Sequence, residues 1–597
     1  MIAYLWHPQF YDSNNPCYHS DMIRRPESIR ESKWQVAPPV PAHIQNGLDH
    51  IHPILLQTLY NRGITDAGHI QAFLDGRYHE STDPFLLPDM DKAVARIQEA
   101  IQNDEMIIVY GDFDADGVTS TVLLTQALRG LGVERRRIRP YIPDRFEEGY
   151  GLNQAALAQL KEMGAGLIIT VDCGIRAIAE VAYAKELGLD IIVTDHHSLG
   201  DEPPPALAVI NPKRQDSRYP EKMLAGVGIA YKLAQALYQV MHDRAEIDVE
   251  QLLDLVAIGT VADLAPLQGE NRCLVIDGLA VLNQLKRPGL AALASLTGLK
   301  RGTMNAESIG FGLGPRINAA GRLAHAYVAA RLLAVNNTQS ARQLAQELNE
   351  LNKQRQALTA ELGQKAEAMI DPQELILIAG DETFVPGVVG LVASRLAEKN
   401  YRPAIVLEIG PEVSRGSCRS IAEFHITEAL DETADLLVRH GGHAQAAGLT
   451  LRNENMALFT SRMKEIAKDR LSGLDLMPTI AVDAEISLDE IDWALYETLA
   501  KLEPTGYANP TPVFLSKNVE VMSHRVVGQD GAHLQMRLSS QNGGHAHQLL
   551  PAIAFRQGAW ADELPQIIDV VYSVNLNEWN GRRTLQLMVQ DLRPSAA

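Results

Sequence analysis

The sequence predicts an α/β protein with two α/β lobes, the first built on a parallel sheet, a long helix that joins them, and an antiparallel β-barrel near the end of the chain. Three patterns predict this fold class. Short apolar runs alternate with amphipathic stretches from about residue 90, one long stretch carries apolar residues at helical spacing, and the last part of the chain changes to strict period-two alternation.

The first lobe is predicted from a repeated pattern of short apolar runs and helical stretches. Runs of this length, separated by helices of about 12 residues, are typical of a parallel sheet with helical crossovers. We expect strands at 106–110, 166–172 and 189–195, and helices at 91–102, 119–132, 177–188, 231–243 and 250–263.

A long helix is predicted from about Thr338 to Met369, because this stretch lacks proline, has no glycine before Gly363 and carries apolar residues at helical spacing. It fits either a partner-binding coiled coil or a connecting helix. We favour the connecting helix, since the heptad pattern is short. Beyond it, the segments 374–384 and 401–409 indicate a smaller α/β lobe.

Period-two alternation over 512–522, 533–540 and 570–592 predicts a small antiparallel barrel or sandwich. Tight hairpin turns are expected at Asp530-Gly531, Asn542-Gly543 and Asn580-Gly581.

The last hairpin end carries Trp579, Arg582 and Arg583. It fits a nucleic-acid surface on a five-stranded barrel about as well as an ordinary exposed hairpin end.

These patterns divide the chain into five segments. They are an N-terminal helical segment (1–80), the parallel-sheet domain (81–337), the connecting helix (338–370), the second lobe (371–470) and the barrel domain (471–597). Residues 1–50 carry no motif that predicts a function.

Composition limits the possible functions. The chain has 597 residues and a formal net charge of −20, with 46% hydrophobic and 21% charged residues, which is typical of a globular protein. The four cysteines have no paired spacing, which argues against a disulfide framework or a structural zinc site and favours a reducing compartment. We expect a cytoplasmic protein with no membrane partner, because the sequence shows neither a signal-peptide pattern nor an apolar run as long as a membrane helix.

The acidic balance argues weakly against a nucleic-acid partner, because phosphate binding needs local Lys and Arg. Net charge is a sum over the whole chain, however, so a basic groove remains compatible with it.

The strongest chemical signal is GDFDADG (111–117), which follows the apolar run 106–110 directly. It places Asp112, Asp114 and Asp116 within a few ångströms of each other at the end of a buried strand, where they would repel one another without a cation. The segment also matches the start of an EF-hand calcium loop. We reject that interpretation, because Leu123 stands at the twelfth position and a strand precedes the loop.

Two more predicted strands end in acidic or imidazole side chains. Asp172 follows one strand, and Asp195, His196 and His197 follow the next. The carboxyl ends of parallel strands meet at one edge of a sheet, so these groups can converge there, and Asp263 can close the cluster. A single strand-end Asp is more often a helix N-cap, but three such clusters in one domain favour a metal site.

Carboxylate oxygens with one or two imidazoles favour Mn²⁺ or Mg²⁺ over a thiolate-rich zinc site. Asp172 is the candidate to bridge two ions. Two ions about 4 Å apart would activate a water and stabilise the attacking and leaving oxygens of a phosphoryl group. The sequence therefore predicts phosphoester hydrolysis.

These residues also carry a family resemblance. GDFDADG, VDCG (171–174), TDHH (194–197) and GTVADL (259–264) resemble the four motifs of the DHH phosphoesterase superfamily, and GGHAQAAG (441–448) resembles the DHH-associated domain. GPRINAAGR (314–322), PDRFEEGYG (143–151) and LEPTGYANPTPVF (502–514) are similar to segments of the RecJ branch, the bacterial single-strand-specific exonucleases. The resemblance covers about residues 50–597.

The resemblance implies an enzyme that hydrolyses phosphodiester bonds of single-stranded DNA from the 5′ end by a two-metal mechanism, with Mn²⁺ or Mg²⁺, and releases 5′-mononucleotides in DNA repair and recombination. It implies that the barrel is of the OB type and binds the strand. The implied partners are single-stranded DNA, a single-strand-binding protein and a helicase.

Matched to the family's motifs, the metal ligands are Asp114, Asp116, Asp172, His196 and Asp263, with Asp112 and Asp195 as ligands or beside them. His197 would stabilise the transition state or act as an acid toward the leaving oxygen, and Asp195 would orient an imidazole.

A 5′-phosphate and DNA-binding site is implied by the same comparison, and Arg and Ser side chains suit phosphate chemically. It comprises Arg145, Tyr150, Arg316, Asn318, Ser417, Arg419 and His443. Tyr150 fits either a base-stacking residue or a packed turn tyrosine. We expect a cationic channel between the two lobes, lined by Arg145, Arg316 and Arg419.

Cys418 departs from the family pattern, which usually has a Gly or another small residue at this position of GSxRS. A reactive thiol and a buried small filler are the two interpretations, and we favour the filler.

The main alternative function is a DHH phosphoesterase that acts on short oligonucleotides or cyclic dinucleotides. Such enzymes need only the two α/β lobes, so the barrel domain counts against this alternative. A non-enzymatic scaffold of DHH descent is disfavoured, because the full set of acids and histidines is present.

Overall fold

The computed structural model describes residues 29–77, 83–540, 549–579 and 581–595. Two compact units are present. One comprises Gly76–Leu476, and the other combines the chain up to Asp75 with the chain from Met477 onward. In the described residues, no helix has the length and apolarity that a membrane span requires.

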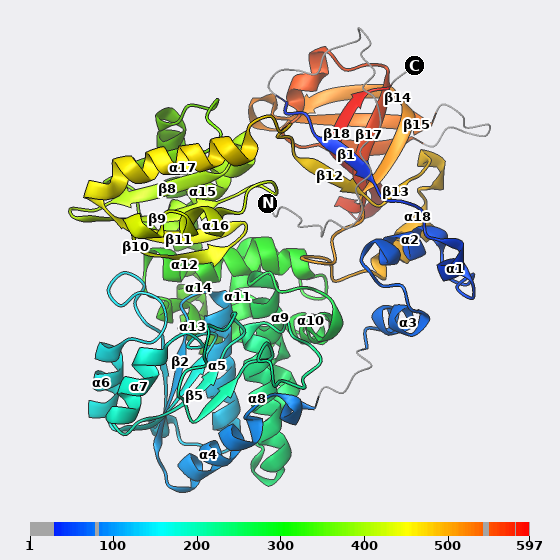
Figure 1. Ribbon diagram of the computed structural model, residues 1–597. Helices are drawn as coiled ribbons and strands as arrows, with labels where there is room; N and C mark the ends of the chain where they lie inside the picture. The colour runs from blue at the N-terminus through cyan, green and yellow to red at the C-terminus, as the bar shows by residue number, and fades with distance from the viewer. Residues whose placement is uncertain (1–28, 78–82, 541–548, 580, 596–597) are drawn as a thin grey trace. The chain divides into compact units, whose positions relative to one another are not determined.

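A five-stranded parallel sheet, of which Figure 1 labels β2 and β5, forms the first lobe, and its strand order is β3-β2-β4-β5-β6. Its strands are β2 (Met106–Gly111), β3 (Ile138–Tyr141), β4 (Ala165–Val171), β5 (Asp190–Thr194) and β6 (Ala208–Ile210). The chain leaves β2 toward β3 on one side and later pairs β4 on the other side, so the carboxyl ends of β2 and β4 border a topological switch point. Open α/β sheets bind their ligands at such a point.

Helices cover both faces of this sheet. One face packs against α6 (Gln154–Glu162) and α7 (Ile178–Glu186) through side chains such as Ile108 and Ile168. The other face packs against α4 (Met90–Gln102), α5 (Ala115–Gly130) and α8 (Gly226–Val240). Since both faces are buried, the strands are continuously apolar. The predicted parallel α/β domain is confirmed.

A helical layer continues the first lobe and leads to the second. It contains α9 (Leu253–Ala262), α10 (Gly269–Leu282), α11 (Pro288–Thr297), the π-helix η5 (Ser308–Leu313), α12 (Gly314–Leu323), α13 (Tyr327–Ala334) and the long α14 (Thr338–Met369). Asn337 caps α14 by accepting a hydrogen bond from the Ser340 amide. The long helix therefore begins and ends where the sequence predicts.

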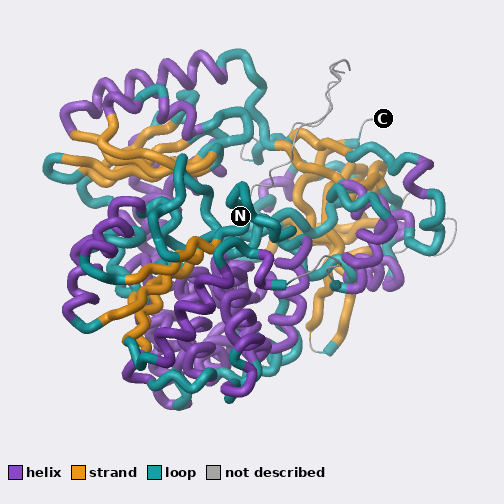
Figure 2. The backbone as a smooth tube through the Cα atoms, turned by 60° about the horizontal axis from the view of Figure 1, so that its bottom comes forward, coloured by secondary structure: helices purple, strands orange, loops and turns teal. Residues whose placement is uncertain are grey.

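The second lobe is a mixed five-stranded sheet, in the order β10-β11-β9-β8-β7. Its elements are β7 (Leu377–Asp381), α15 (Pro386–Asn400), β8 (Ala404–Ile409), β9 (Val413–Arg419), α16 (Ile426–Asp431), β10 (Leu437–His443), β11 (Ala446–Arg452) and α17 (Met456–Leu471). α17 packs on one face of the sheet and α15 on the other. Figure 2 shows the two sheets of this unit as separate groups of strands, each bordered by helices.

The other unit contains a closed five-stranded barrel. Pairing runs β14-β15-β16-β18-β17, and β17 pairs back to β14. Its elements are β12 (Thr479–Val482), β13 (Ala484–Glu485), α18 (Trp493–Ala500), β14 (Phe514–Val527), β15 (His533–Ser540), β16 (Leu550–Ala554), β17 (Ile567–Trp579) and β18 (Arg582–Pro594). The predicted five-stranded barrel is confirmed, but it is not wholly antiparallel, because β16 pairs with β18 in parallel.

The structure describes the three predicted hairpin turns to different extents. Asp530-Gly531 lies in the connection between β14 and β15, and β17 pairs β18 from Trp579↔Arg582 onward, as a two-residue turn requires. Asn542-Gly543 and Asn580 lie outside the described residues.

The N-terminal segment belongs to the same unit as the barrel. β1 (Lys33–Val36) pairs in parallel with β12, and the helices α1 (Ala42–Gln45), α2 (Pro53–Asn61) and α3 (Ala67–Asp75) follow it. Leu55, Leu59 and Ile70 share one apolar cluster with barrel residues such as Phe514.

Candidate metal centre

The segment after β2 supplies the first carboxylates. Asp114 is the N-cap of α5, where its Oδ1 accepts hydrogen bonds from the amides of Asp116 and Gly117, both at 3.0 Å. A strand precedes this segment, as the rejection of an EF-hand requires. Asp112 is buried, and its Oδ1 has no hydrogen-bond partner.

Asp116 is held by the backbone at the start of α8. Its Oδ2 accepts from the Gly226 amide and its Oδ1 from the Val227 amide, both at 2.8 Å. Burial, and then the charge of Asp114, raises the pKa of Asp116 to about 7. The first turns of α5 and α8 are thereby joined through one buried carboxylate.

Asp172 follows β4 in a left-handed backbone conformation, with φ of 61°. A Cβ at Gly226 would lie 2.6 Å from Asp172 Oδ1, so this site requires a glycine at the start of α8. Asp172 Oδ1 is buried and has no hydrogen-bond partner.

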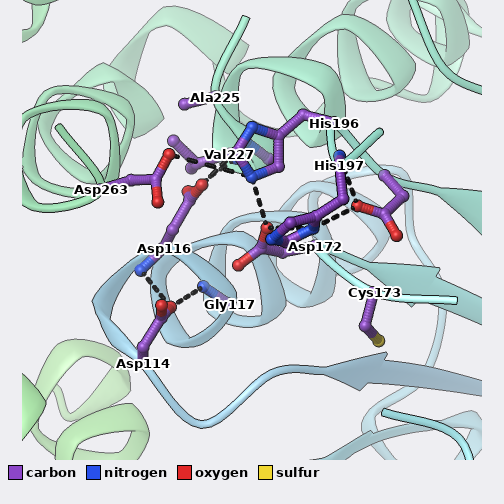
Figure 3. Close-up of polar contacts among 12 residues, drawn as sticks. Asp114, Asp116, Gly117, Asp172, Cys173, His196, His197, Ala225, Val227 and Asp263 are labelled. Atoms are coloured by element: carbon purple, nitrogen blue, oxygen red, sulfur yellow. Dashed lines mark hydrogen bonds and ion pairs between the residues drawn. The ribbon is translucent and has the colours of Figure 1, made fainter. Parts of the chain in front are cut away.

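His196 faces two of these acids (Figure 3). Its Nε2 lies 3.1 Å from Asp172 Oδ1 and 3.8 Å from Asp263 Oδ2, yet this buried nitrogen makes no hydrogen bond. The ring is hydrogen bonded to the backbone of Leu224. Burial, and then the charge of His197, lowers the pKa of His196 to about 3, so the ring is neutral, as a metal ligand must be.

His197 is paired with Asp195 instead. Asp195 Oδ1 accepts from the His197 amide at 3.0 Å and lies 2.7 Å from His197 Nδ1, and its Oδ2 accepts from the Ile175 amide at 2.9 Å. Burial acts to lower the pKa of His197, but the hydrogen bond and charge of Asp195 outweigh it and raise that pKa. The two neighbouring histidines thus have opposite electrostatic surroundings.

The structure brings the predicted acids and histidines together. Possible ligand atoms lie within 4.8 Å of one another in three groups: Asp172, His196 and His197; Asp116, His196 and Asp263; and Asp112, Asp114 and Asp172. Asp172 and His196 each belong to two of these groups.

The donor set fits divalent cations. Asp112 Oδ1, Asp172 Oδ1 and His196 Nε2 are buried ligand atoms without hydrogen bonds, and leaving such atoms unpaired is costly unless a cation binds them. Burial, and then the neighbouring carboxylates, raises the pKa of Asp112, Asp172 and Asp263. A bound cation would reverse this effect, because an opposite charge favours the ionised form. Oxygen donors with one or two imidazoles suit Mn²⁺ or Mg²⁺.

Three of the predicted phosphate-binding residues can be located from their contacts. Arg145 lies near the metal centre, and Ser417 and Arg419 lie together beside α15. The guanidinium carbon of Arg145 stands 4.7 Å from the centroid of the Phe113 ring, and the charges of Asp112 and Asp114 act on Arg145. A Cβ at Gly390 would lie 3.4 Å from both Ser417 Oγ and Arg419 Nη2, so these two side chains meet the first turns of α15.

Tyr150 and His443 lie close to His197. The Tyr150 ring centroid is 6.2 Å from that of His197, and its side chain is exposed. His443 is the last residue of β10. Burial, and then the charges of His197, Lys213 and Arg176, lowers the pKa of His443. The second lobe therefore brings an imidazole toward the metal centre.

Asn318 and Arg316 already have protein partners. Asn318 Oδ1 accepts from the Ala115 amide at 2.8 Å, which ties α12 to the start of α5. Arg316 donates to the Gly312 carbonyl at 2.7 Å and to Asn349 Oδ1 at 3.0 Å. Both residues join the helices around the site.

Comparison with known proteins identifies the three predicted parts. Residues 106–260 match the DHH family N-terminal domain, residues 373–469 the DHHA1 domain and residues 482–591 the RecJ OB domain. The single-stranded-DNA-specific exonuclease RecJ of Bacillus subtilis is 39% identical over 94% of this chain and 70% of its own length. The chain belongs to the RecJ family.

Solved RecJ structures extend this similarity to the fold. The RecJ of Thermus thermophilus in complex with Mn²⁺ matches with a TM-score of 0.81 and 32% identity, covering 95% of this chain and 80% of its own. The same protein in complex with Mg²⁺ matches with a TM-score of 0.75 and 30% identity, over 95% and 79% of the two chains.

Sequence reasoning missed two cations at this RecJ site. Lys213 follows β6, and its charge acts on Asp263 and His196. Arg322 ends the segment GPRINAAGR, and the charges of Arg145 and Arg419 act on it. Arg322 is the last residue of GPRINAAGR, a segment that signals the family, whereas nothing in the sequence around Lys213 marks it.

Proposed function

We propose that this chain is an exonuclease that hydrolyses single-stranded DNA from its 5′ end and releases 5′-mononucleotides, in DNA repair and recombination. The observation that carries this proposal is the set of buried carboxylate and imidazole atoms without hydrogen bonds at the ends of β2, β4 and β5. Membership in the RecJ family supports single-stranded DNA as the substrate.

Asp112, Asp114, Asp116, Asp172, His196 and Asp263 would hold two ions of Mn²⁺ or Mg²⁺, with Asp172 between them. When bound, such ions polarise the scissile phosphate and lower the pKa of an attacking water. The backbone amides of Gly226 and Val227 fix both oxygens of Asp116, so the α8 end of this ligand set is rigid before any ion binds.

His197 would hold a proton for the leaving oxygen. Asp195 fixes the ring by binding Nδ1, which leaves Nε2 as the proton-carrying atom, and it favours the charged imidazolium. This pairing resembles the orienting role that an acid plays beside a catalytic histidine. His196, with its lowered pKa, is unsuited to this role.

The 5′-terminal phosphate would be bound by Arg145, Ser417 and Arg419. Guanidinium groups form bidentate hydrogen bonds with phosphate, and the Ser417 hydroxyl adds a further donor. The exposed Tyr150 ring, near His197, would stack on a base. The barrel would bind the rest of the strand, as OB folds do. We also propose a single-strand-binding protein and a helicase as partners.

The test uses strands labelled at the 5′ or 3′ end, with Mn²⁺. The first product from the 5′ label is expected to be a mononucleotide, and the Asp172→Ala variant is expected to lose hydrolysis to background while its strand affinity stays within about threefold of wild type. Release from the 3′ end would refute the polarity, and turnover by the variant would remove Asp172 from the bridging position.

A further inference from the structure

Four successive residues, 224–227, contact three of the candidate metal ligands. The amides of the last two donate to the two oxygens of Asp116, at 2.8 Å each (Figure 3). The backbone of the first is hydrogen bonded to the His196 ring. The third, Gly226, packs so closely on Asp172 that an added Cβ would lie 2.6 Å from Oδ1. The positions of three ligands therefore depend on where this segment lies.

The segment begins in a connection without regular structure, because residues 211–225, between β6 and α8, form neither a helix nor a strand. The backbone groups of such a connection need partners from elsewhere. Asn271, in the first turn of α10, supplies two of them. Its Nδ2 donates to the Met223 carbonyl at 2.6 Å, and its Oδ1 accepts from the Ala225 amide at 3.4 Å. Asn271 is fully buried, so water cannot replace these contacts.

Glu270 fixes the same connection at an earlier residue and also fixes α8. Its Oε2 accepts from the Tyr219 hydroxyl at 2.5 Å, and its Oε1 lies 2.5 Å from Nζ of Lys232, which belongs to α8. All three side chains are at most 2% exposed. Removal of one partner from a buried ion pair leaves the other charge uncompensated, so this network favours one arrangement of α8, α10 and the connection.

These contacts reach the metal centre through the backbone. In the part of the chain that the structure describes, Glu270 belongs to none of the three groups of possible ligand atoms. Both polar atoms of the Asn271 amide are bonded to the connection between β6 and α8. Groups that orient a ligand without touching the metal typically change metal affinity about 10- to 100-fold.

We propose that Asn271 and Glu270 are positioning residues of the metal centre, which keep segment 224–227 where its backbone presets three ligands for Mn²⁺ or Mg²⁺. This proposal rests on the metal centre of the proposed function. The positioning acts before any strand binds. Its loss therefore raises the Mn²⁺ concentration that the protein needs, whereas a merely structural role would lower only the melting temperature.

The test measures Mn²⁺ binding by the full chain without DNA, from the electron paramagnetic resonance signal of free Mn²⁺. Asn271→Ala is expected to raise the Kd for Mn²⁺ about tenfold, while kcat at saturating Mn²⁺ and KM for the strand stay within about threefold of wild type.

Tyr219→Phe is the milder second variant, and it decides the test if Asn271→Ala fails to fold. It keeps the ring and removes the hydroxyl that donates to Glu270. We expect it to raise the Kd for Mn²⁺ about threefold.

Asn283→Ala is the matched control, because Asn283 caps the other end of α10 and its amide also bonds the backbone of a loop. Its Nδ2 donates to the Met304 carbonyl at 2.8 Å, and its Oδ1 accepts from the Met304 amide at 2.9 Å. We expect Asn283→Ala and Asn271→Ala to lower the melting temperature by similar amounts, but only Asn271→Ala should change the Kd for Mn²⁺.

The outcomes separate this proposal from the one on which it rests. An equal Kd for Mn²⁺ in wild type, Asn271→Ala and Tyr219→Phe would refute the positioning role, and so would an equal rise in Asn283→Ala or a fall in kcat without a rise in Kd. Absence of Mn²⁺ binding by the wild type would refute the metal centre itself. A wild type that binds Mn²⁺ but releases no nucleotide would refute only the proposed function, because the Kd values would still decide the positioning role.

Discussion

At the scale of single residues, the pair Asp195 and His197 offers the sharpest test of the chemistry. Asp195→Asn keeps the shape of the side chain but removes its negative charge. That charge orients the His197 imidazole and favours its protonated form. We expect kcat to fall roughly 10- to 100-fold, with KM for the strand and the Mn²⁺ requirement within about threefold of wild type. Steady-state kinetics over a Mn²⁺ series would measure this.

The control for this prediction is the double variant. His197→Ala combined with Asp195→Asn should lose little more than His197→Ala alone, because both changes act on one imidazole. A raised Mn²⁺ requirement in Asp195→Asn would instead place Asp195 among the metal ligands.

Cys418 provides a second residue-scale prediction. It is fully buried in the core of the second lobe, and burial raises the pKa of its thiol to about 12. A thiol in this state is protonated at pH 8 and shielded, so we expect no labelling by iodoacetamide in the folded protein and labelling in denaturant. Peptide mass spectrometry would measure both. Labelling of Cys418 itself in the native chain would restore the reactive-thiol interpretation.

The sequence predicts which residues meet at the centre better than it predicts their partners. Residues that follow parallel strands lie at the same edge of the sheet, so the sequence alone predicts that these acids and histidines meet. The bond between Asn318 and the Ala115 amide spans 203 residues, and no local pattern contains it. Phosphate or DNA binding by Asn318, implied by the family resemblance, stays a prediction, and the structure adds that its oxygen joins two helices.

At the scale of elements, the close approach of α12 to the loop after β2 is the feature most open to test. A Cβ at Gly321 would lie 2.3 Å from the Phe113 carbonyl oxygen, which is backbone and cannot turn aside. Gly321→Ala should push α12 away from the segment that carries Asp112 and Asp114. We expect a stability loss of about 1–3 kcal/mol and weaker Mn²⁺-dependent hydrolysis.

Gly363→Ala is the matched control, because its nearest neighbour is Arg395 Nη1 at 3.9 Å, an ordinary contact in the middle of α14. Alanine is the better helix former, so this variant should gain up to about 1 kcal/mol. Calorimetry would compare the two. Equal melting temperatures for wild type and Gly321→Ala would show that α12 can move away from Phe113 without a loss of stability.

Elements with a clear period were predictable, and their junctions were not. The 32 residues of α14 follow from spacing and from the absence of proline. The π-helix η5 before α12 has no such signature, because it depends on how the chain packs between α9 and α11.

At the scale of the whole molecule, the two ends of the chain build one unit, although the sequence suggested separate segments at 1–80 and 471–597. The pairing Lys33↔Thr479 joins β1 to β12, and such distant pairing leaves no trace in either segment alone. The N-terminal helices bury Leu55, Leu59 and Ile70 against residues of the barrel core. These helices therefore need the barrel for their stability.

Two truncations test this dependence. The fragment 76–476 contains the whole of one compact unit, so it should fold, bind Mn²⁺ and hydrolyse strands with a raised KM, since it lacks the barrel. The fragment 1–476 adds helices whose apolar faces have lost their cover, so it should aggregate or bind a hydrophobic dye. If 1–476 proved as monomeric as 76–476, then α2 and α3 would bury their apolar side chains without the barrel. Loss of Mn²⁺-dependent hydrolysis in 76–476 would instead show that the metal centre needs the other unit.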